Sequence, residues 1–256
     1  MSRPRTIHGL RPVLELLRTR PATVEAIVTS RDLRREGTSG DLLTLARKRR
    51  VEVRHVSRRE VDDLAGDRGH QGVVAILHEE TLPQVEDPLE LVAAARAEGR
   101  DPLLVLLDGI QDPGNLGALI RSAWALGADG VILPKDRASP LTPVAVKASA
   151  GAALSCPVVT VTNLARTIEQ LEKEGVWAVA ADLSDEAVDL PDARLDGPLA
   201  VVVGAEGKGL RRLVRERCSQ WVKIPMARDF QSFNASVAGA LILYEAWRQR
   251  RAISKK

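Results

Sequence analysis

The chain has 256 residues, of which 45% are hydrophobic and 28% are charged, as in globular proteins of one or two domains. Its apolar runs are too short to span a membrane and its N-terminus lacks an apolar signal core, so we expect a cytoplasmic protein without membrane contact. Aromatic residues make up only 3%, which argues against a platform of stacked bases for single-stranded nucleic acid.

The N-terminal part of the chain predicts a small alternating α/β unit. The pattern favours a helix over 7–20, a strand over 25–30, a helix over 41–50 capped by Asp41, a strand over 51–56, a short helix capped by Ser57, and a strand over 73–77. Residues 78–100 contain few apolar residues apart from a helical pattern over 89–97. We therefore predict a domain over 1–78, a linker over 79–100 and a second domain over 101–256.

The second domain alternates strand and helix patterns repeatedly. The predicted segments are 103–107, 115–126, 130–133, 142–150, 157–160, 163–174, 176–180, 199–203, 210–217, 221–224 and 234–250. Alternation of this kind predicts an α/β fold, with a mostly parallel sheet that carries helices on both faces.

Positive charge is concentrated near the N-terminus. Residues 1–80 hold 16 Lys and Arg against 12 Asp and Glu, and residues 81–256 hold 21 against 22. Because phosphate contacts dominate nucleic-acid affinity, the basic N-terminal part is favoured as the docking region, although any single cluster could be only a solvated helix face. A second basic run, 208–217, follows a glycine-rich loop, and this position favours a phosphate contact there.

Two apolar runs end in loops rich in glycine. The first, 103–107, is followed by a Pro-Gly turn and a helical pattern, with Asn115 at the expected N-cap and Arg121 in the second turn. Such strand ends bind ligands in open α/β sheets, but Asn115 could only cap the helix and Arg121 could be solvated. The second run, 199–203, leads into GAEGKGL at 204–210, which matches neither a phosphate-binding loop nor a dinucleotide fingerprint.

A third polar turn precedes the last helix. Ser232, Asn234 and Ser236 lie between the strand end at 221–226 and a long amphipathic pattern. Backbone N–H groups and side-chain donors meet there, which suits a small polar ligand. The alternative is a cluster of capping residues that only starts the helix.

Together these segments identify a family. DPGNLGALIRSA (112–123), VVVGAEGKGL (201–210) and IPMARDFQSFNASVA (224–238) each resemble one of the three motifs of the SpoU/TrmH branch of the SPOUT RNA methyltransferases, in the same order. NLARTIEQL (163–171), HQGVVA (70–75) and IHGLRPVLELL (7–17) extend the resemblance over nearly the whole chain. Within the family, the chain is most similar to bacterial enzymes that methylate a guanosine ribose of large-subunit rRNA. Phe233 and Ala235 depart from the usual Leu and Val.

The resemblance implies further properties. It implies a trefoil knot in the C-terminal domain, an N-terminal RNA-binding domain like a ribosomal protein, and a homodimer. It implies S-adenosyl-L-methionine as cofactor and RNA as partner, with large-subunit rRNA favoured and no DNA expected. By position, the catalytic residues are Asn115, Arg121, Glu206, Ser232 and Asn234, and the cofactor-binding residues are Gly204, Ile224, Met226 and Phe233.

The residue types in the second domain fit this chemistry. All four histidines precede residue 81, which disfavours a local Ser-His-Asp hydrolase and a histidine-ligated metal there, and we expect no metal. Cys156 and Cys218 are expected to be free buried thiols. Because a guanidinium resists deprotonation, Arg121 is expected to clamp phosphate and a developing alkoxide. Glu206 is expected to orient the substrate or the arginine, unless it only pairs with Lys208.

We therefore expect transfer of a methyl group to a ribose 2′-hydroxyl, and the resemblance favours a guanosine in 23S rRNA as its site. The amides, hydroxyls, arginine and glutamate named above can align a hydroxyl and stabilise charge, which is what this reaction requires. Two alternatives stay open from the sequence: a tRNA ribose as the substrate, or a non-catalytic RNA-binding protein of ribosome assembly.

Overall fold

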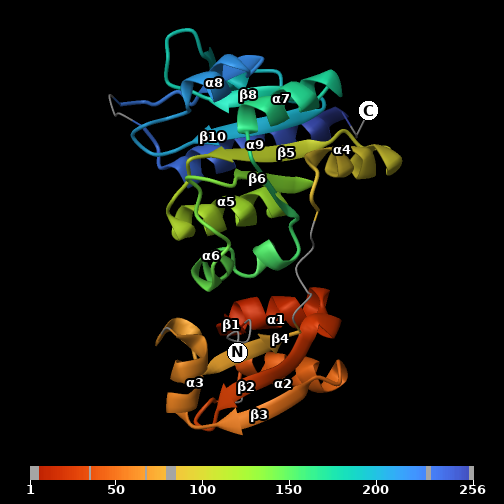
Figure 1. Ribbon diagram of the computed structural model, residues 1–256, viewed down its shortest axis with the longest axis vertical. Coiled ribbons are helices and arrows are strands. Elements are labelled where there is room, and N and C mark those ends of the chain that lie inside the picture. The colour runs from red at the N-terminus through yellow and green to blue at the C-terminus, as the bar shows by residue number, and fades with distance from the viewer. Residues whose placement is uncertain (1–5, 35, 67, 79–84, 229–231, 254–256) are drawn as a thin grey trace. The chain divides into compact units, whose positions relative to one another are not determined.

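The computed structural model describes residues 6–34, 36–66, 68–78, 85–228 and 232–253 (Figure 1). Residue contacts divide the chain into two units, Met1–Pro83 with Leu141–Ser155, and Gln84–Pro140 with Cys156–Lys256. Nothing in the sequence pattern indicated that the segment 141–155, which contains α6 (Pro143–Ala148), groups with the first unit. The domain boundaries expected from the sequence stay a prediction.

The first unit contains a mixed four-stranded sheet with the order β1-β4-β2-β3. β4 is antiparallel to both β1 and β2, and β2 is parallel to β3. The strands are β1 (Thr6–His8), β2 (Val24–Ser30), β3 (Glu52–Val56) and β4 (Val73–Leu77), and the helices of this part are α1 (Leu10–Thr19), α2 (Thr38–Lys48) and α3 (Arg58–Ala65).

Three local predictions for this unit can be compared with the structure. The expected helix over 7–20 begins only at Leu10, because residues 6–8 pair with β4 instead. The expected cap Asp41 is wrong, since α2 already begins at Thr38 and Asp41 lies in its first turn. Ser57 is confirmed as a cap: its Oγ accepts a hydrogen bond from the N–H of Glu60 (3.3 Å), and the Glu60 carboxylate accepts one from the N–H of Ser57 (2.8 Å).

The second unit contains a seven-stranded sheet with the order β7-β6-β5-β10-β8-β11-β9, and every strand pair in it is parallel. This confirms the predicted α/β fold with a mostly parallel sheet. The strands are β5 (Leu103–Asp108), β6 (Gly130–Pro134), β7 (Val158–Val161), β8 (Trp177–Ala181), β9 (Val188–Asp189), β10 (Leu199–Gly204) and β11 (Gln220–Lys223). The two-residue strand β9 was not predicted.

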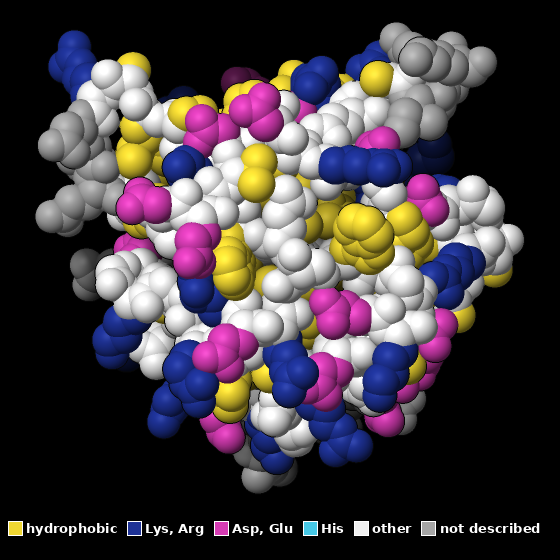
Figure 2. Space-filling view, turned by 90° about the horizontal axis from the view of Figure 1, so that it is seen from above, with side chains coloured by type: hydrophobic (Ala, Val, Ile, Leu, Met, Phe, Trp, Pro, Cys, Tyr) yellow, Lys and Arg dark blue, Asp and Glu magenta, His cyan; other side chains and the backbone are white. Residues whose placement is uncertain are grey.

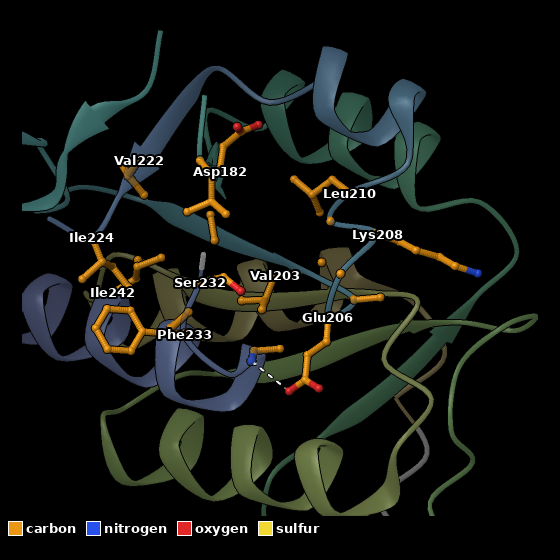
Figure 3. Close-up of a pocket in the computed structure, with 18 of the residues that line it drawn as sticks. Asp182, Val203, Glu206, Lys208, Leu210, Val222, Ile224, Ser232, Phe233 and Ile242 are labelled. Atoms are coloured by element: carbon orange, nitrogen blue, oxygen red, sulfur yellow. Dashed lines mark hydrogen bonds between the residues drawn. The ribbon is translucent and has the colours of Figure 1, made fainter. Parts of the chain in front are cut away.

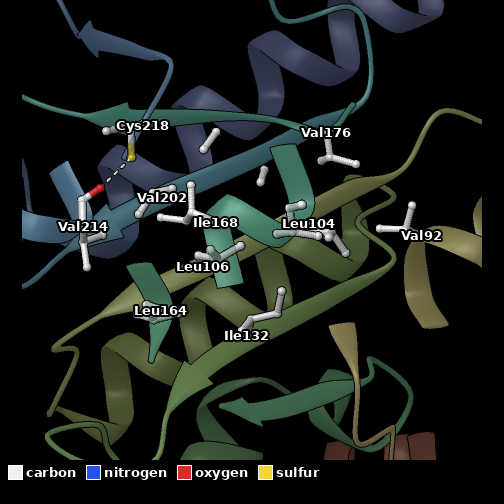
Figure 4. Packing of buried hydrophobic residues seen from close by; sticks show 14 of the residues in the cluster. Val92, Leu104, Leu106, Ile132, Leu164, Ile168, Val176, Val202, Val214 and Cys218 are labelled. Carbon is white, nitrogen blue, oxygen red and sulfur yellow. Dashed lines mark hydrogen bonds between the residues drawn. The ribbon is translucent and has the colours of Figure 1, made fainter. Parts of the chain in front are cut away.

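Helices cover both faces of this sheet (Figure 1). One face carries α4 (Pro88–Ala97), α7 (Leu164–Lys173) and α8 (Arg212–Glu216), and the other carries α5 (Pro113–Ala125) and α9 (Ala235–Ile253). On the first face, Leu104 and Val202 of the central strands pack with Ile168 in one buried cluster (Figure 4). Burying an aliphatic side chain of this size contributes about 2 kcal/mol to the free energy of folding.

On the second face, a glycine lets α9 approach both its neighbours. A Cβ atom on Gly239 would lie 2.5 Å from Leu119 of α5 and 3.2 Å from Val203 of β10. The N-terminus of α9 is thereby held beside the ends of β10 and α5. These are the elements that carry the three sequence motifs.

Cys156 and Cys218 are free and buried, as predicted. Burial raises the pKa of each thiol to about 12, so both stay protonated near neutral pH. Within the described ranges, none of the helices combines the length and the apolar character that crossing a membrane requires.

Candidate functional site

An open cavity of about 510 Å³ lies at the carboxyl ends of β8, β10 and β11 (Figure 3). Its apolar wall includes Val203, Leu210, Val222, Ile224, Met226, Phe233 and Ile242, and its polar lining includes Asp182, Glu206, Lys208, Arg215 and Ser232. The Lys208 side chain points away from the cavity (Figure 3). The volume lies in the range of small-molecule sites, and a mostly apolar wall with a few polar groups is typical of them.

The glycine-rich loop is folded tightly against itself. The N–H of Ala205 donates to the carbonyl of Gly209 (3.1 Å), and the N–H of Gly209 donates to the carbonyl of Ala205 (2.9 Å). A Cβ atom on Gly204 would lie 2.4 Å from the carbonyl carbon of Gly209 and 2.7 Å from the backbone nitrogen of Leu210. Gly204 therefore has to be glycine because backbone meets backbone there.

An ion pair anchors the far end of this loop. Asp108, the last residue of β5, is only 1% exposed. Its carboxylate accepts hydrogen bonds from the backbone N–H of Arg211 (2.8 Å) and from the Arg211 Nε (2.6 Å). Sequence reasoning missed Asp108. The signal that could have found it is a single carboxylate at the end of an otherwise apolar strand.

The three motifs meet in one hydrogen-bond network. The Asn115 side-chain amide donates to Glu206 Oε1 (3.2 Å), and the Asn234 amide donates to Asn115 Oδ1 (3.0 Å) and also to Glu206 Oε1. The N–H of Ala235, at the start of α9, donates to the same Glu206 oxygen (3.3 Å; dashed line in Figure 3). Glu206 therefore binds the other two motifs, and no ion pair joins it to Lys208.

The structure decides whether each of the two asparagines caps a helix. Asn115 is not the N-cap of α5: Asp112 is, and its carboxylate accepts the N–H of Asn115 (2.7 Å). Asn234 does cap α9, since its Oδ1 accepts the N–H groups of Ser236 (2.9 Å) and Val237 (3.4 Å). The side-chain oxygen of Asn234 starts the helix and its amide nitrogen joins the network.

The remaining predicted residues divide into two groups. Gly204, Ile224, Met226, Ser232 and Phe233 all line the cavity, and Phe233 is 40% exposed there. Arg121 lies on the solvent-exposed face of α5, and among the described residues its guanidinium has no hydrogen-bond or ion-pair partner. The structure thus brings together all of the predicted site residues except Arg121.

A second pair that sequence reasoning missed forms part of the cavity wall. Arg215 Nε donates to Asp182 Oδ2 and Arg215 Nη2 donates to Ser184 Oγ (3.1 Å), while the guanidinium lies 4.1 Å from the ring centre of Trp221. Burial by itself raises the pKa of Asp182, but the hydrogen bonds from Arg215 and Ser184 outweigh burial and hold the pKa below its ordinary value. This pair joins the ends of β8, α8 and β11.

The four arginines of the basic run 208–217 all form ion pairs with carboxylates. Besides Arg211 and Arg215, Arg212 pairs with Glu216 (2.8 Å) and Arg217 with Glu169 (2.8 Å). Lys208 alone has no ion-pair partner within the part of the chain that the structure describes. Basic and acidic side chains also lie next to one another on the face shown in Figure 2. The run is therefore largely neutralised, which removes the main argument for a phosphate contact there.

Comparisons with known proteins agree with this arrangement. The SpoU rRNA methylase family model matches residues 102–244, and a model for RNA 2′-O ribose methyltransferase substrate binding matches residues 6–83. The chain is 44% identical to the 23S rRNA (guanosine-2′-O-)-methyltransferase RlmB of Pseudomonas putida, over 98% of this chain and 99% of that protein. It is 41% identical to the Photobacterium profundum enzyme of the same name, over 96% of this chain and 98% of that protein.

Solved structures give the same result. The SpoU methyltransferase AviRb from Streptomyces viridochromogenes, in complex with the cofactor AdoMet, superposes with a TM-score of 0.73 at 30% identity, over 98% of this chain and 92% of that one. One family model covers more than half of the chain, and the full-length relatives extend over nearly all of it. The chain belongs to the SpoU rRNA methylase family.

Proposed function

We propose that this protein transfers a methyl group from S-adenosyl-L-methionine to the ribose 2′-hydroxyl of a guanosine in 23S rRNA. The observation that carries the proposal is the network of Asn115, Glu206 and Asn234, which joins all three family motifs at the edge of the cavity. The full-length relatives named above support the choice of substrate.

The cavity suits the cofactor in size and in chemistry. Its apolar wall accommodates a purine ring, and the backbone groups of the Gly204 loop lie beside it. We assign Gly204, Ile224, Met226 and Phe233 to holding the cofactor, which when bound supplies the methyl group and the leaving group. The chain itself has to position the ribose hydroxyl and to manage one proton.

Glu206 and the two asparagines position the ribose. Three N–H donors, from Asn115, Asn234 and the backbone of Ala235, hold Glu206 Oε1, so the direction of the carboxylate is fixed. In this orientation the carboxylate can accept a hydrogen bond from a ribose hydroxyl, and Ser232 on the cavity wall adds a hydroxyl. Aligning the acceptor before the reaction is a main source of rate enhancement in such a site.

Arg121 acts as a cation on the RNA phosphate and on the oxygen that develops negative charge. Replacing it with alanine should lower kcat about 100-fold, which is typical of removing one such stabilising group. The binding of the cofactor should not change, because Arg121 does not line the cavity.

A homodimer would bring Arg121 to a site. α5 and α9 pack together, and their outer faces expose Trp124 (43%), Val237 (44%), Leu241 (38%) and Tyr244 (52%). Large apolar side chains gathered on neighbouring helices are typical of a subunit interface. Because Arg121 lies one turn from Trp124, we propose that a second copy covers this face and that the two sites share Arg121. Activity regained in mixed dimers of Arg121→Ala and Asn234→Ala subunits would support sharing, and dimers that stay inactive would contradict it.

Two structural features implied by the family complete the proposal. We assign a trefoil knot to the C-terminal part, where the chain passes from β10 across β8 to β11 before it enters α9. We assign a ribosomal-protein-like RNA-binding role to the N-terminal unit. Its match to a substrate-binding family supports that role.

The decisive experiment offers labelled cofactor with 23S rRNA, tRNA and intact large subunits. We expect label in 23S rRNA, and alkaline digestion with mass spectrometry should find it on a ribose, because a 2′-O-methylated nucleotide resists cleavage on its 3′ side. Label in tRNA alone would change the substrate, label on a base would overturn the mechanism, and no transfer at all would favour a non-catalytic protein.

A further inference from the structure

A groove of about 490 Å³ lies within the first unit, whereas the cavity described above belongs to the second. It lies between the 3-10 turn η1 (Pro21–Thr23) and the turn that joins α2 to β3. Its lining consists of Pro21, Ala22, Val24, Glu25, Lys48, Arg49, Arg50 and Val51. Three cations and one carboxylate therefore face an otherwise apolar floor, which gives the groove a net positive charge.

The cations around this groove lack partners. The consecutive side chains 47–50 are all exposed, and within the described ranges none of them makes a hydrogen bond or an ion pair. Arg54 on the neighbouring strand is different, because its Nη2 lies 2.8 Å from the carboxylate of Glu52. Four adjacent like charges repel one another, so a cluster of this kind favours the binding of an anionic polymer.

The backbone of Arg50 is unusual for an arginine. α2 ends in a motif in which the N–H of Arg50 donates to the carbonyl of Arg47 (3.1 Å) and the N–H of Val51 donates to that of Ala46 (3.0 Å). The motif requires a left-handed residue, and Arg50 supplies it with φ 59°. Glycine is the residue that usually occupies this position, because it has no Cβ atom to collide with the backbone. The chain thus carries a cation at a position where glycine would make the folded protein more stable.

We propose that this groove binds the phosphodiester backbone of the RNA substrate, with Lys48, Arg49 and Arg50 contacting phosphates. Backbone rather than base recognition follows from the lining, which contains cations but no aromatic ring on which a base could stack. The inference rests on the proposed function for the identity of the polymer. It adds a docking site that is separate from the place of methyl transfer.

Arg50→Gly tests the proposal, because this change removes the cation and suits the backbone. Binding of in vitro transcribed 23S rRNA is measured without cofactor at several salt concentrations. We expect Kd at low salt to rise roughly threefold to tenfold and the slope of log Kd against log salt to fall by about one. The Tm of the variant should equal or exceed that of the parent protein. Arg54→Gln, which removes one cation that is already paired, should change neither Kd nor the slope.

The outcomes separate this inference from the proposed function. A folded Arg50→Gly protein with unchanged Kd and slope overturns the groove as a docking site. Equal weakening by Arg54→Gln also overturns it, because overall charge would then explain the effect. If the parent protein transfers no methyl group to 23S rRNA, the proposed function fails on that assay, whatever the binding data show.

Discussion

Two basic stretches of this chain, 47–50 and 208–217, look alike in the sequence but have different surroundings in the structure. Every arginine of the later stretch has a carboxylate partner, and two of those partners, Asp108 and Asp182, lie at the ends of strands beside the cavity. The cations of the earlier stretch have no partner among the described residues. Paired cations hold loops in place, whereas unpaired ones are available to a ligand, so a count of charges alone does not locate a nucleic-acid site.

The largest expected effect concerns the pair of Asp108 and Arg211. Arg211→Ala leaves a buried carboxylate with only a backbone N–H as partner, so the free energy of unfolding should fall by about 3 kcal/mol. Chemical denaturation measures it. Arg212→Ala is the matched control, since its exposed pair with Glu216 is worth about 0.3 kcal/mol. Equal effects of the two variants would contradict the distinction between anchoring and surface pairs.

The next effect lies in the other stretch. Changing Lys48 and Arg49 together to serine should raise the Kd for 23S rRNA roughly 20-fold at low salt, because two of the proposed phosphate contacts are lost. The free energy of unfolding should change by less than about 0.5 kcal/mol, since these side chains are exposed and unpaired. A variant that unfolds more easily but binds RNA normally would contradict this prediction, because these cations would then stabilise the fold instead of binding the ligand.

A smaller effect sharpens the role of Arg215. Arg215→Ala removes the partner of Asp182 on the cavity wall, and also the contacts to Ser184 and Trp221. The Kd for S-adenosyl-L-methionine should therefore rise about tenfold, or about 1.4 kcal/mol. Binding of 23S rRNA should stay normal. Calorimetry measures the cofactor affinity of this variant and of the control Arg217→Ala. The control should bind the cofactor normally, because Glu169, the partner of Arg217, does not line the cavity. If Arg215→Ala left the cofactor affinity unchanged, Arg215 would have no role in shaping the cavity for the cofactor.

The smallest effect depends on pH. The pKa of Asp182 is lower in the folded protein than its ordinary value near 4, so its contribution to stability is present above that value. The contribution disappears as the pH falls through the lowered pKa. The stability difference between the parent protein and Asp182→Asn, about 1 kcal/mol or less at pH 7, should therefore shrink as the pH falls below about 4 and vanish once Asp182 is protonated in the folded protein. A difference that persists there would show that ionisation of Asp182 is irrelevant.

The apolar runs 103–107 and 199–203 predicted their strands because a central parallel strand is buried on both faces. Residues 7 and 8 were assigned to a helix, since so short a strand as β1 carries no periodicity and only pairing with β4 decides its conformation. The family motifs named Asn115, Glu206 and Asn234 as site residues, but the hydrogen bonds that join them were not predicted. Asp108 and Arg211 are 103 residues apart, and no local pattern reveals that they meet.

The closed loop behind Gly204 has a consequence for the way a ligand enters. Two backbone hydrogen bonds between Ala205 and Gly209 already fix this loop in the free protein, so binding does not have to order it. When a ligand binds, this loop therefore loses less conformational entropy than a flexible loop would. The ligand meets a surface that already has its final shape. The amide protons of Ala205 and Gly209 should exchange slowly with solvent even before any ligand is added.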